Sequence, residues 1–262
     1  MQVARQSAHT RTKALVALLL TFAAGIVDIV GYISVYHIFV AHMTGATVHF
    51  GSRIMMSDWA EAARAGATIF SFVAGSVIGR SVIEAASRRR KRTAASMTLL
   101  LEAVLIVVVV WIGRRVIDPG DLVVTPLGPV CLLLGLLAAA MGLQTATLTR
   151  IGPLTIHTTF VTGMLNKAAQ AASEWFFWIH DEWKKRPSLV RLIRNTKDNS
   201  ALRNSLFMAA IWCSYVIGSA AGTWLDRRQE LEPLYLPVAI LLIAIAVDQI
   251  WPLSVEEERE QA

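Results

Sequence analysis

Long apolar runs, each separated from the next by polar residues, dominate the pattern of this chain. A helix that crosses a bilayer needs about 20 mostly apolar residues, because unpaired backbone groups are too costly in lipid. Six segments meet this requirement, and we expect each to span a membrane: 14–38, 59–84, 95–113, 126–149, 203–224 and 233–252.

Two further segments are shorter or more polar than a span. They lie near 44–56 and 162–178, and they begin with the Thr-Gly pairs Thr44–Gly45 and Thr162–Gly163. We interpret them as half-spans or interfacial helices, with a seventh or eighth span as the alternative. The threonine of each pair is a candidate N-cap, because its hydroxyl can accept a hydrogen bond from a free backbone N–H group.

Positive charge is concentrated in alternate polar segments. Three cations precede the first span, the second loop contains Arg88 to Arg92, and the fourth loop contains six further cations: Lys184, Lys185, Arg186, Arg191, Arg194 and Lys197. Cytoplasmic loops of membrane proteins carry an excess of Lys and Arg. We therefore expect a multi-pass protein of a bacterial cytoplasmic membrane, with both termini cytoplasmic and with the apolar N-terminal segment retained as the first span.

The composition agrees with a membrane protein and argues against nucleic-acid binding. Charged residues make up 17% of the chain, compared with about 25% in soluble domains, and the mean hydropathy is +0.51. Cytoplasmic loops explain the net charge of +6, and we expect them to contact anionic lipid head groups. Cys131 and Cys213 fit no metal or redox spacing, so we expect neither a metal nor a cofactor.

The order of motifs in the first half recurs in the second. Ser71–Arg80 and Ser214–Thr223 coincide at five of ten positions at an offset of 143 residues. Gly25–Asp28 is similar to Gly142–Thr145 at an offset of 117, and the Thr-Gly pairs are 118 residues apart. Because each half has an odd number of spans, the second half must enter from the opposite face. The expected fold is an all-α integral membrane protein of two inverted three-helix repeats, each with a Thr-Gly half-helix or re-entrant segment.

This repeat divides the chain into five expected parts. They are a cytoplasmic tail (1–13), a first three-span repeat (14–113), an external loop (114–125), a second three-span repeat (126–252) with a basic cytoplasmic insertion near 175–200, and an acidic cytoplasmic tail (253–262).

Asp28 lies near the middle of the first expected span. A lone charge there costs at least about 2.5–3.5 kcal/mol, so the carboxylate should face the bundle interior or a cavity. It is either a proton or cation site, or an acceptor for the backbone N–H groups of a broken helix. With the Thr-Gly pairs and their neighbours it forms a predicted pathway or solute site: Asp28, Thr44, Gly45, Gln144, Thr145, Thr162 and Gly163.

Small residues and a second acid predict helix contacts. The Gly-x-x-x-Gly pairs Gly75–Gly79 and Gly218–Gly222 should let helices approach closely. We expect span two to pack against span five within one chain, with a homodimer contact as the alternative. Glu102 in the third span and Arg80 at the end of the second are expected to form an ion pair.

The histidines near the Thr-Gly segments are His42, His49 and His157. Their spacing matches no metal motif, and we expect them to form hydrogen bonds near the membrane interface. The aromatic run Trp175–Trp183, followed by basic residues, predicts an interfacial helix, since aromatic rings favour the head-group region.

These motifs resemble the YoaK family of small bacterial membrane proteins, which is defined by a domain of unknown function. The resemblance covers about 14–252 and rests on four motifs: Gly25-x-x-Asp28, Phe39–Gly45, Met141–Gln144 and Thr158–Gly163. The chain departs from the family at Ala46 and Thr145, where members often carry Asn. The resemblance implies a multi-span integral membrane protein and gives no established substrate.

Three features indicate a small secondary transporter or permease for a small solute: the inverted repeat, the helix breaks and the intramembrane carboxylate. Inverted repeats with broken helices at the midplane are common in this class, and protons or cations are the candidates for coupling. The alternative is a non-transporting scaffold or sensor that acts through the basic loop and has a dry bundle. The sequence contains none of the usual hydrolase or nucleotide-binding motifs, so we do not expect an enzyme.

Overall fold

A computed structural model describes residues 2–89, 93–117, 126–147, 150–151, 154–155, 161–185, 195–196, 199–226 and 231–253. This part of the chain is helical apart from connecting segments and a small hairpin of two strands, each two residues long. The elements are α1 (Gln2–Val30), which continues into a π-helical turn (Gly31–Val35), α2 (Met43–Met55), α3 (Trp59–Arg88), α4 (Ala94–Val116), α5 (Leu127–Thr147), β1 (Arg150–Ile151), β2 (Leu154–Thr155), α6 (Val161–Lys185), α8 (Ser200–Leu225), a 3-10 turn (Glu232–Leu234) and α9 (Tyr235–Ile250).

The six predicted spans are confirmed. Within the described residues, six helical segments are long and apolar enough to cross a membrane: His9–Val35, Trp59–Arg88, Ala94–Val116, Leu127–Thr147, Ser200–Leu225 and Glu232–Ile250. α2 has 13 residues and is therefore only about 20 Å long, short of the hydrocarbon thickness. α6 has 25 residues but is too polar to count as a span.

Polar caps and prolines set where several helices begin. Asp58 precedes α3 and accepts a hydrogen bond of 3.3 Å from the Glu61 N–H group, which is half of a capping box. Asn199 precedes α8 and accepts from the N–H groups of Ala201 and Leu202. Pro233 lies in the short turn that leads into α9, where a missing N–H group has no cost.

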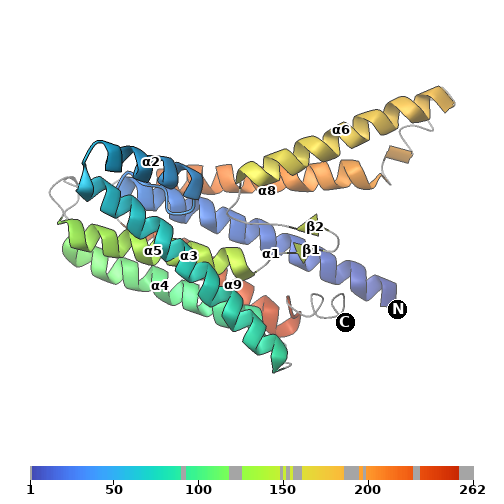
Figure 1. The fold of residues 1–262 in the computed structure, drawn as a ribbon. Helices are drawn as coiled ribbons and strands as arrows, with labels where there is room; N and C mark the ends of the chain where they lie inside the picture. Colours follow the sequence, from blue (N-terminus) through green and yellow to red (C-terminus); the bar gives the residue numbers. More distant parts are fainter. Residues whose placement is uncertain are drawn as a thin grey trace.

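The ribbon shows a bundle of long helices from which one end of a helix pair extends (Figure 1). α1, α3, α4, α5 and α9 lie roughly alongside one another, and α8 packs against α1. α6 packs against α8, and the far end of this pair extends beyond the other helices. The start of α1 and the end of α9 lie at the same end of the bundle. α2 and α6 begin near each other in the middle of the molecule and run away in opposite directions.

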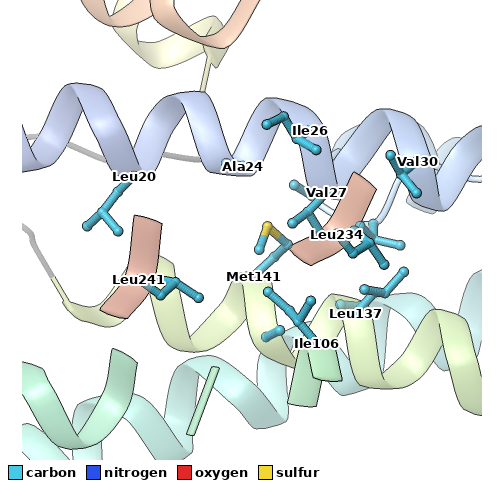
Figure 2. Packing of buried hydrophobic residues seen from close by; sticks show 14 of the residues in the cluster. Leu20, Ala24, Ile26, Val27, Val30, Ile106, Leu137, Met141, Leu234 and Leu241 are labelled. Carbon is cyan, nitrogen blue, oxygen red and sulfur yellow. The ribbon is translucent and has the colours of Figure 1, made fainter. Parts of the chain in front are cut away.

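The hydrophobic core lies where α1, α4, α5 and α9 meet (Figure 2). Leu20 and Val27 of α1 face Met141 of α5, with Ile106 of α4 and Leu241 of α9 closing the cluster. All five side chains are buried. This core fixes the first and fourth spans relative to each other and so positions the segments that follow them.

Glycines allow two close helix crossings within the chain. A Cβ atom added to Gly142 of α5 would lie 2.2 Å from the Phe72 carbonyl oxygen of α3, and one added to Gly75 would lie 2.1 Å from the Ala139 carbonyl oxygen. In α8, a Cβ atom on Gly218 would lie 2.1 Å from the Phe22 carbonyl oxygen of α1. Because real Cβ atoms do not approach backbone this closely, these contacts require glycine.

The predicted packing of the Gly-x-x-x-Gly pairs inside one chain is therefore confirmed, but the predicted partner was wrong. Span two (α3) packs against α5, and span five (α8) packs against α1, rather than the two packing against each other. Gly79 meets Leu143 and Gly222 meets Ile26 in the same two crossings. α3 faces Gly142 of α5, and α8 faces Gly25 of α1. Because both helices of each crossing carry glycine at the contact, their backbones can approach closely.

Some predicted boundaries differ from the structure. α1 begins at Gln2, so most of the segment expected as a tail, 1–13, is helical. α6 continues to Lys185, so the first part of the insertion predicted near 175–200 extends a helix. Residues 118–125 and 254–262, together with most of the basic residues expected in the second and fourth loops, lie outside the described residues.

Candidate functional site

A cavity of about 610 Å³ lies between the starts of α2 and α6. Its described lining is mostly apolar, with the hydroxyls of three threonines and one imidazole as polar groups. The lining residues are Phe39, Ala41, His42, Met43, Thr44, Gly45, Phe72, Thr145, Val161 and Thr162. The two Thr-Gly pairs, which are 118 residues apart, thus contribute to one cavity.

Neither threonine is an N-cap. The N-cap of α2 is His42, so Thr44 is the second residue of that helix, and Thr162 is the second residue of α6. Both threonines are exposed to solvent in the isolated chain. The first N–H groups of an α-helix have no partner within the helix. Because neither threonine caps its helix, their hydroxyls are available for other hydrogen bonds.

Asp28 is 1% exposed and lies beneath the start of α2. Its Oδ1 accepts a hydrogen bond of 2.9 Å from the Ala41 N–H group, and its Oδ2 accepts a short one from the Tyr215 hydroxyl of α8. The Nδ1 atom of His42 lies 3.0 Å from the same Oδ2. The carboxylate therefore holds the broken segment after α1 in place, which is the second of the two roles expected for it.

His42 connects this buried carboxylate to the cavity. Its side chain is 41% exposed, in contrast to the 1% of Asp28, and it lines the cavity wall. The hydrogen bond to Asp28 raises the pKa of His42 above its ordinary value, against the smaller opposing effect of burial. Because Nδ1 is occupied by Asp28, Nε2 is the nitrogen available to exchange a proton with the cavity.

The other predicted site residues are divided between the cavity and the core. Thr145 lines the cavity, and its hydroxyl donates to the Met141 carbonyl oxygen at 2.8 Å. Gln144 does not belong to the described lining. It is fully buried and donates through Nε2 to the Leu20 carbonyl oxygen at 2.8 Å, which ties α5 to α1. Gly163 lies in the first turn of α6 beside the lining, and His157 lies outside the described residues.

A polar cluster that the sequence analysis missed joins α2, α3 and the segment before α2. Glu61 accepts hydrogen bonds from the Tyr36 hydroxyl and from Arg64 Nη1, the latter at 2.5 Å, and lies 3.2 Å from His49 Nε2. The Arg64 guanidinium also covers the Tyr36 ring at 4.3 Å. The only sequence signal was the i, i+3 pair of Glu61 and Arg64 at the start of a span, because Tyr36 and His49 match no motif.

The predicted ion pair between Arg80 and Glu102 is not formed. Both carboxylate oxygens of Glu102 are buried and lack a hydrogen-bond partner within the described structure, whereas Arg80 is exposed. The pairing fails because Glu102 lies on the buried face of α4 and Arg80 on the exposed face of α3. A third buried acid, Asp248 of α9, instead lies at the start of α4: it accepts from the Ser96 N–H group and hydroxyl at 2.9 and 2.5 Å.

Comparison with known proteins places these features in a family. The sequence model of a family described as protein of unknown function (DUF1275) matches residues 16–247. The chain is 29% identical over 162 residues to UPF0700 transmembrane protein YoaK of Bacillus subtilis (strain 168), covering 61% of this chain and 67% of that protein. No solved structure matches. With its six candidate spans, the chain is a transmembrane protein.

Proposed function

The chain belongs to the DUF1275 family of proteins of unknown function, and on this premise we propose that it is a small secondary transporter or permease whose solute binds between the starts of α2 and α6. One observation carries the proposal: two Thr-Gly helix starts, far apart in the sequence, line one cavity beside the Asp28–His42 pair. Transporter sites are typically built from broken helices at the interface of two repeats.

The glycine contacts support an inverted repeat as the framework of this site. Gly142 of α5 packs against Phe72 of α3, and Gly25 of α1 packs against Tyr215 of α8. The two glycines are 117 residues apart and their two partners are 143 residues apart, the same offsets as in the sequence motifs. A pseudo-two-fold axis would therefore exchange α1 with α5 and α3 with α8. It would also exchange α2 with α6, which agrees with the opposite directions of these helices (Figure 1).

We further propose a proton as the coupling ion. Proton carriers in membranes are commonly Asp, Glu or His residues that face a cavity. Asp28 is buried and receives three donors, and His42 offers its second nitrogen to the cavity. A proton taken up at Nε2 would turn this unit into an imidazolium–carboxylate pair, which changes the charge that a solute in the cavity meets.

The proposed setting is a bacterial cytoplasmic membrane with both termini in the cytoplasm. The six candidate spans of the described residues support two termini on one side, and the basic loops favour the cytoplasmic side. α6 supports contact with lipid head groups, since it exposes Phe176, Phe177 and Trp183 by 65%, 64% and 44% and ends in Lys184 and Lys185. Such a face suits the interfacial region of an anionic membrane.

Transport is tested with the purified chain in liposomes that contain a pH-sensitive dye. Amino acids, sugars, amines and organic acids are added in turn under an imposed membrane potential. We expect at least one class to cause proton movement with the wild type, and Asp28→Asn to abolish it. Thr47→Ala is the control for loss of a polar group near the cavity but outside its lining. Thr47 lies one turn along α2 from Thr44, and its hydroxyl donates to the Met43 carbonyl oxygen of its own helix.

The alternative function, a scaffold or sensor that acts through the basic segment after α6, makes the opposite prediction. In that case no solute class moves protons in any variant, and Asp28→Asn changes only the stability of the chain. Solute-dependent proton movement that is equal in the wild type and Asp28→Asn would retain transport and overturn the role given to the Asp28–His42 pair.

A further inference from the structure

Three acidic side chains are buried within the described spans: Asp28, Glu102 and Asp248. Asp28 receives hydrogen bonds from a backbone N–H group and a tyrosine hydroxyl and contacts an imidazole. Asp248 receives the Ser96 N–H group and hydroxyl on Oδ2 and the Leu253 N–H group on Oδ1. Glu102 is as buried as the others, at 1% exposure, yet neither of its oxygens has a partner within the described structure.

Within the described residues, no cationic side chain bonds to Glu102. Its neighbours on the same face of α4 are Leu99, Ala103 and Ile106, all buried. Of the ionisable groups on the elements packed against α4, Asp248 binds Ser96 and Leu253, whereas Arg80, Glu84 and Arg88 are exposed, and none forms a hydrogen bond with Glu102. Those on α5, α9, the second half of α3 and the turn before α9 are Cys131, Tyr235, Asp248, Arg80, Glu84, Arg88 and Glu232.

An ionised carboxylate in such a place would be strongly disfavoured. Burial removes the water that stabilises the charge, and a buried charge without a partner is avoided by binding a proton instead. A neutral carboxyl group requires much less of its surroundings. These surroundings favour the neutral form of Glu102, since no donor of the described residues that could stabilise an anion reaches it, whereas both aspartates receive donors.

Two hydroxyl groups, those of Thr98 and Thr147, lie on the packed faces of α4 and α5, but neither forms a hydrogen bond with the Glu102 carboxylate. Thr98 lies one turn before Glu102 on the same helix, and side chains on a helix lean towards its N-terminus. The Thr147 hydroxyl of α5 lies 2.8 Å from the Thr98 hydroxyl. The Thr98 hydroxyl itself donates to the Ala95 carbonyl oxygen at 2.8 Å. Hydroxyl groups both donate and accept hydrogen bonds, so a movement that brought Thr98 within reach of Glu102 would give the proton a first acceptor.

We propose that Glu102 is a proton-binding site of this protein, held in the neutral form in this conformation and exchanging its proton only when a rearrangement brings the Thr98 hydroxyl or water within reach of the carboxyl group. The site is separate from the cavity between α2 and α6, because Glu102 does not belong to the described lining. Loss of the proton requires a donor or water to reach the carboxylate, and therefore requires α4 to move relative to α5 or α9. Proton release at Glu102 is thereby linked to a rearrangement of the bundle.

Infrared spectroscopy of the full chain in a detergent without ester groups, such as dodecyl maltoside, tests this proposal at pH 7. A neutral carboxyl group gives a C=O stretching band at higher frequency than the amide bands, and an ionised one does not. We expect this band in the wild type, its loss in Glu102→Gln and its retention in Asp28→Asn, the matched control for a buried acid with donors. A wild-type spectrum without the band, or a band that Glu102→Gln leaves unchanged, would overturn the proposal.

Two further measurements keep the test decisive. If Glu102→Gln does not insert or fold, Glu102→Asp replaces it, and we expect the band to shift because the shorter carboxyl group has a different environment; an unshifted band excludes Glu102 as its source. Transfer into D₂O tests the route. We expect Thr98→Val to slow the deuterium-induced shift of the band at least several-fold, and an unchanged rate would contradict exchange through Thr98.

Discussion

At the scale of single residues, Asp28 shows how one side chain can organise a membrane-embedded break. Its carboxylate receives a backbone N–H group from the broken segment, a hydroxyl from α8 and an imidazole at the cavity wall. Under the offset of the first spans its counterpart is Thr145, and the counterpart of Tyr215 is Phe72. Under the proposed repeat, the polar unit therefore exists in one half only, so the proposed site is not symmetric.

The raised pKa of His42 predicts a pH-dependent stability. The hydrogen bond to Asp28 raises the pKa above the ordinary value of about 6.5, and burial opposes this. The pair therefore contributes its full stabilisation below about pH 6.5, and the contribution is lost as the pH rises through the raised pKa. We expect the difference in thermal midpoint between the wild type and His42→Gln to shrink steadily between pH 5.5 and pH 9.

The matched control for this series is His180→Gln, since His180 is an exposed histidine on α6. Its thermal midpoint should differ little from that of the wild type, and this difference should not follow the pH dependence expected for the His42–Asp28 pair. A difference between the wild type and His42→Gln that grows as the pH rises would contradict the pairing of His42 with Asp28.

At the scale of secondary structure elements, the glycine crossings are expected to limit stability. An added methyl group at Gly142 would meet the Phe72 carbonyl oxygen at 2.2 Å, and neither backbone can move without displacing a span. Overpacking of this kind costs about 1–3 kcal/mol or more. We predict that Gly142→Ala destabilises the folded chain by at least this amount, and that Gly25→Ala in the second crossing does the same.

Gly51→Ala provides the control for these two substitutions. Gly51 lies in α2 with no atom within 4 Å of an added Cβ, so the same change should be neutral or stabilising by up to about 1 kcal/mol through helix propensity. Unfolding of the three variants in denaturant provides the comparison. Equal stability of Gly142→Ala and Gly51→Ala would contradict the close crossing of α3 and α5.

The elements also show what could be predicted from sequence and what could not. Hydropathy located all six spans to within several residues, because the absence of water in lipid imposes a single length and composition on a span. The contact partners were harder to predict. Gly75 and Gly218 carry a packing motif, but the motif does not say which helix it meets. The sequence predicts that Glu102 and Arg80 lie near the same side of the membrane. It does not show that Glu102 lies on the buried face of α4 and Arg80 on the exposed face of α3.

The site was predicted more completely at the level of motifs than of contacts. Repetition of the Thr-Gly pair indicated that both segments belong to one site, and both line the cavity. The neighbourhood of Asp28 depends on residues 13 and 187 positions away along the chain. No local pattern encodes such distances, which is why Tyr215 and the role of His42 appear only in three dimensions.

At the scale of the whole molecule, the two halves meet around the cavity rather than side by side. α1 packs against α8 and α5 against α3, so the first span of each half contacts the third helix of the other. Under the proposed transport function, we expect a rotation of one crossing relative to the other to open the cavity on one side and close it on the other. The cluster of Tyr36, Glu61 and Arg64 lies where such a movement would separate the segment before α2 from α3.

A water-filled cavity between the starts of α2 and α6 is tested most directly by cysteine accessibility. Thr44→Cys and Thr162→Cys are made in a chain whose Cys131 and Cys213 are replaced, and a membrane-impermeant thiol reagent is applied from each side in turn. Ala24→Cys, in the buried core, is the negative control. We predict that both positions react, and that Asp28→Asn changes the side from which they do so. If neither position reacts from either side, the cavity is dry and the scaffold function replaces the transporter.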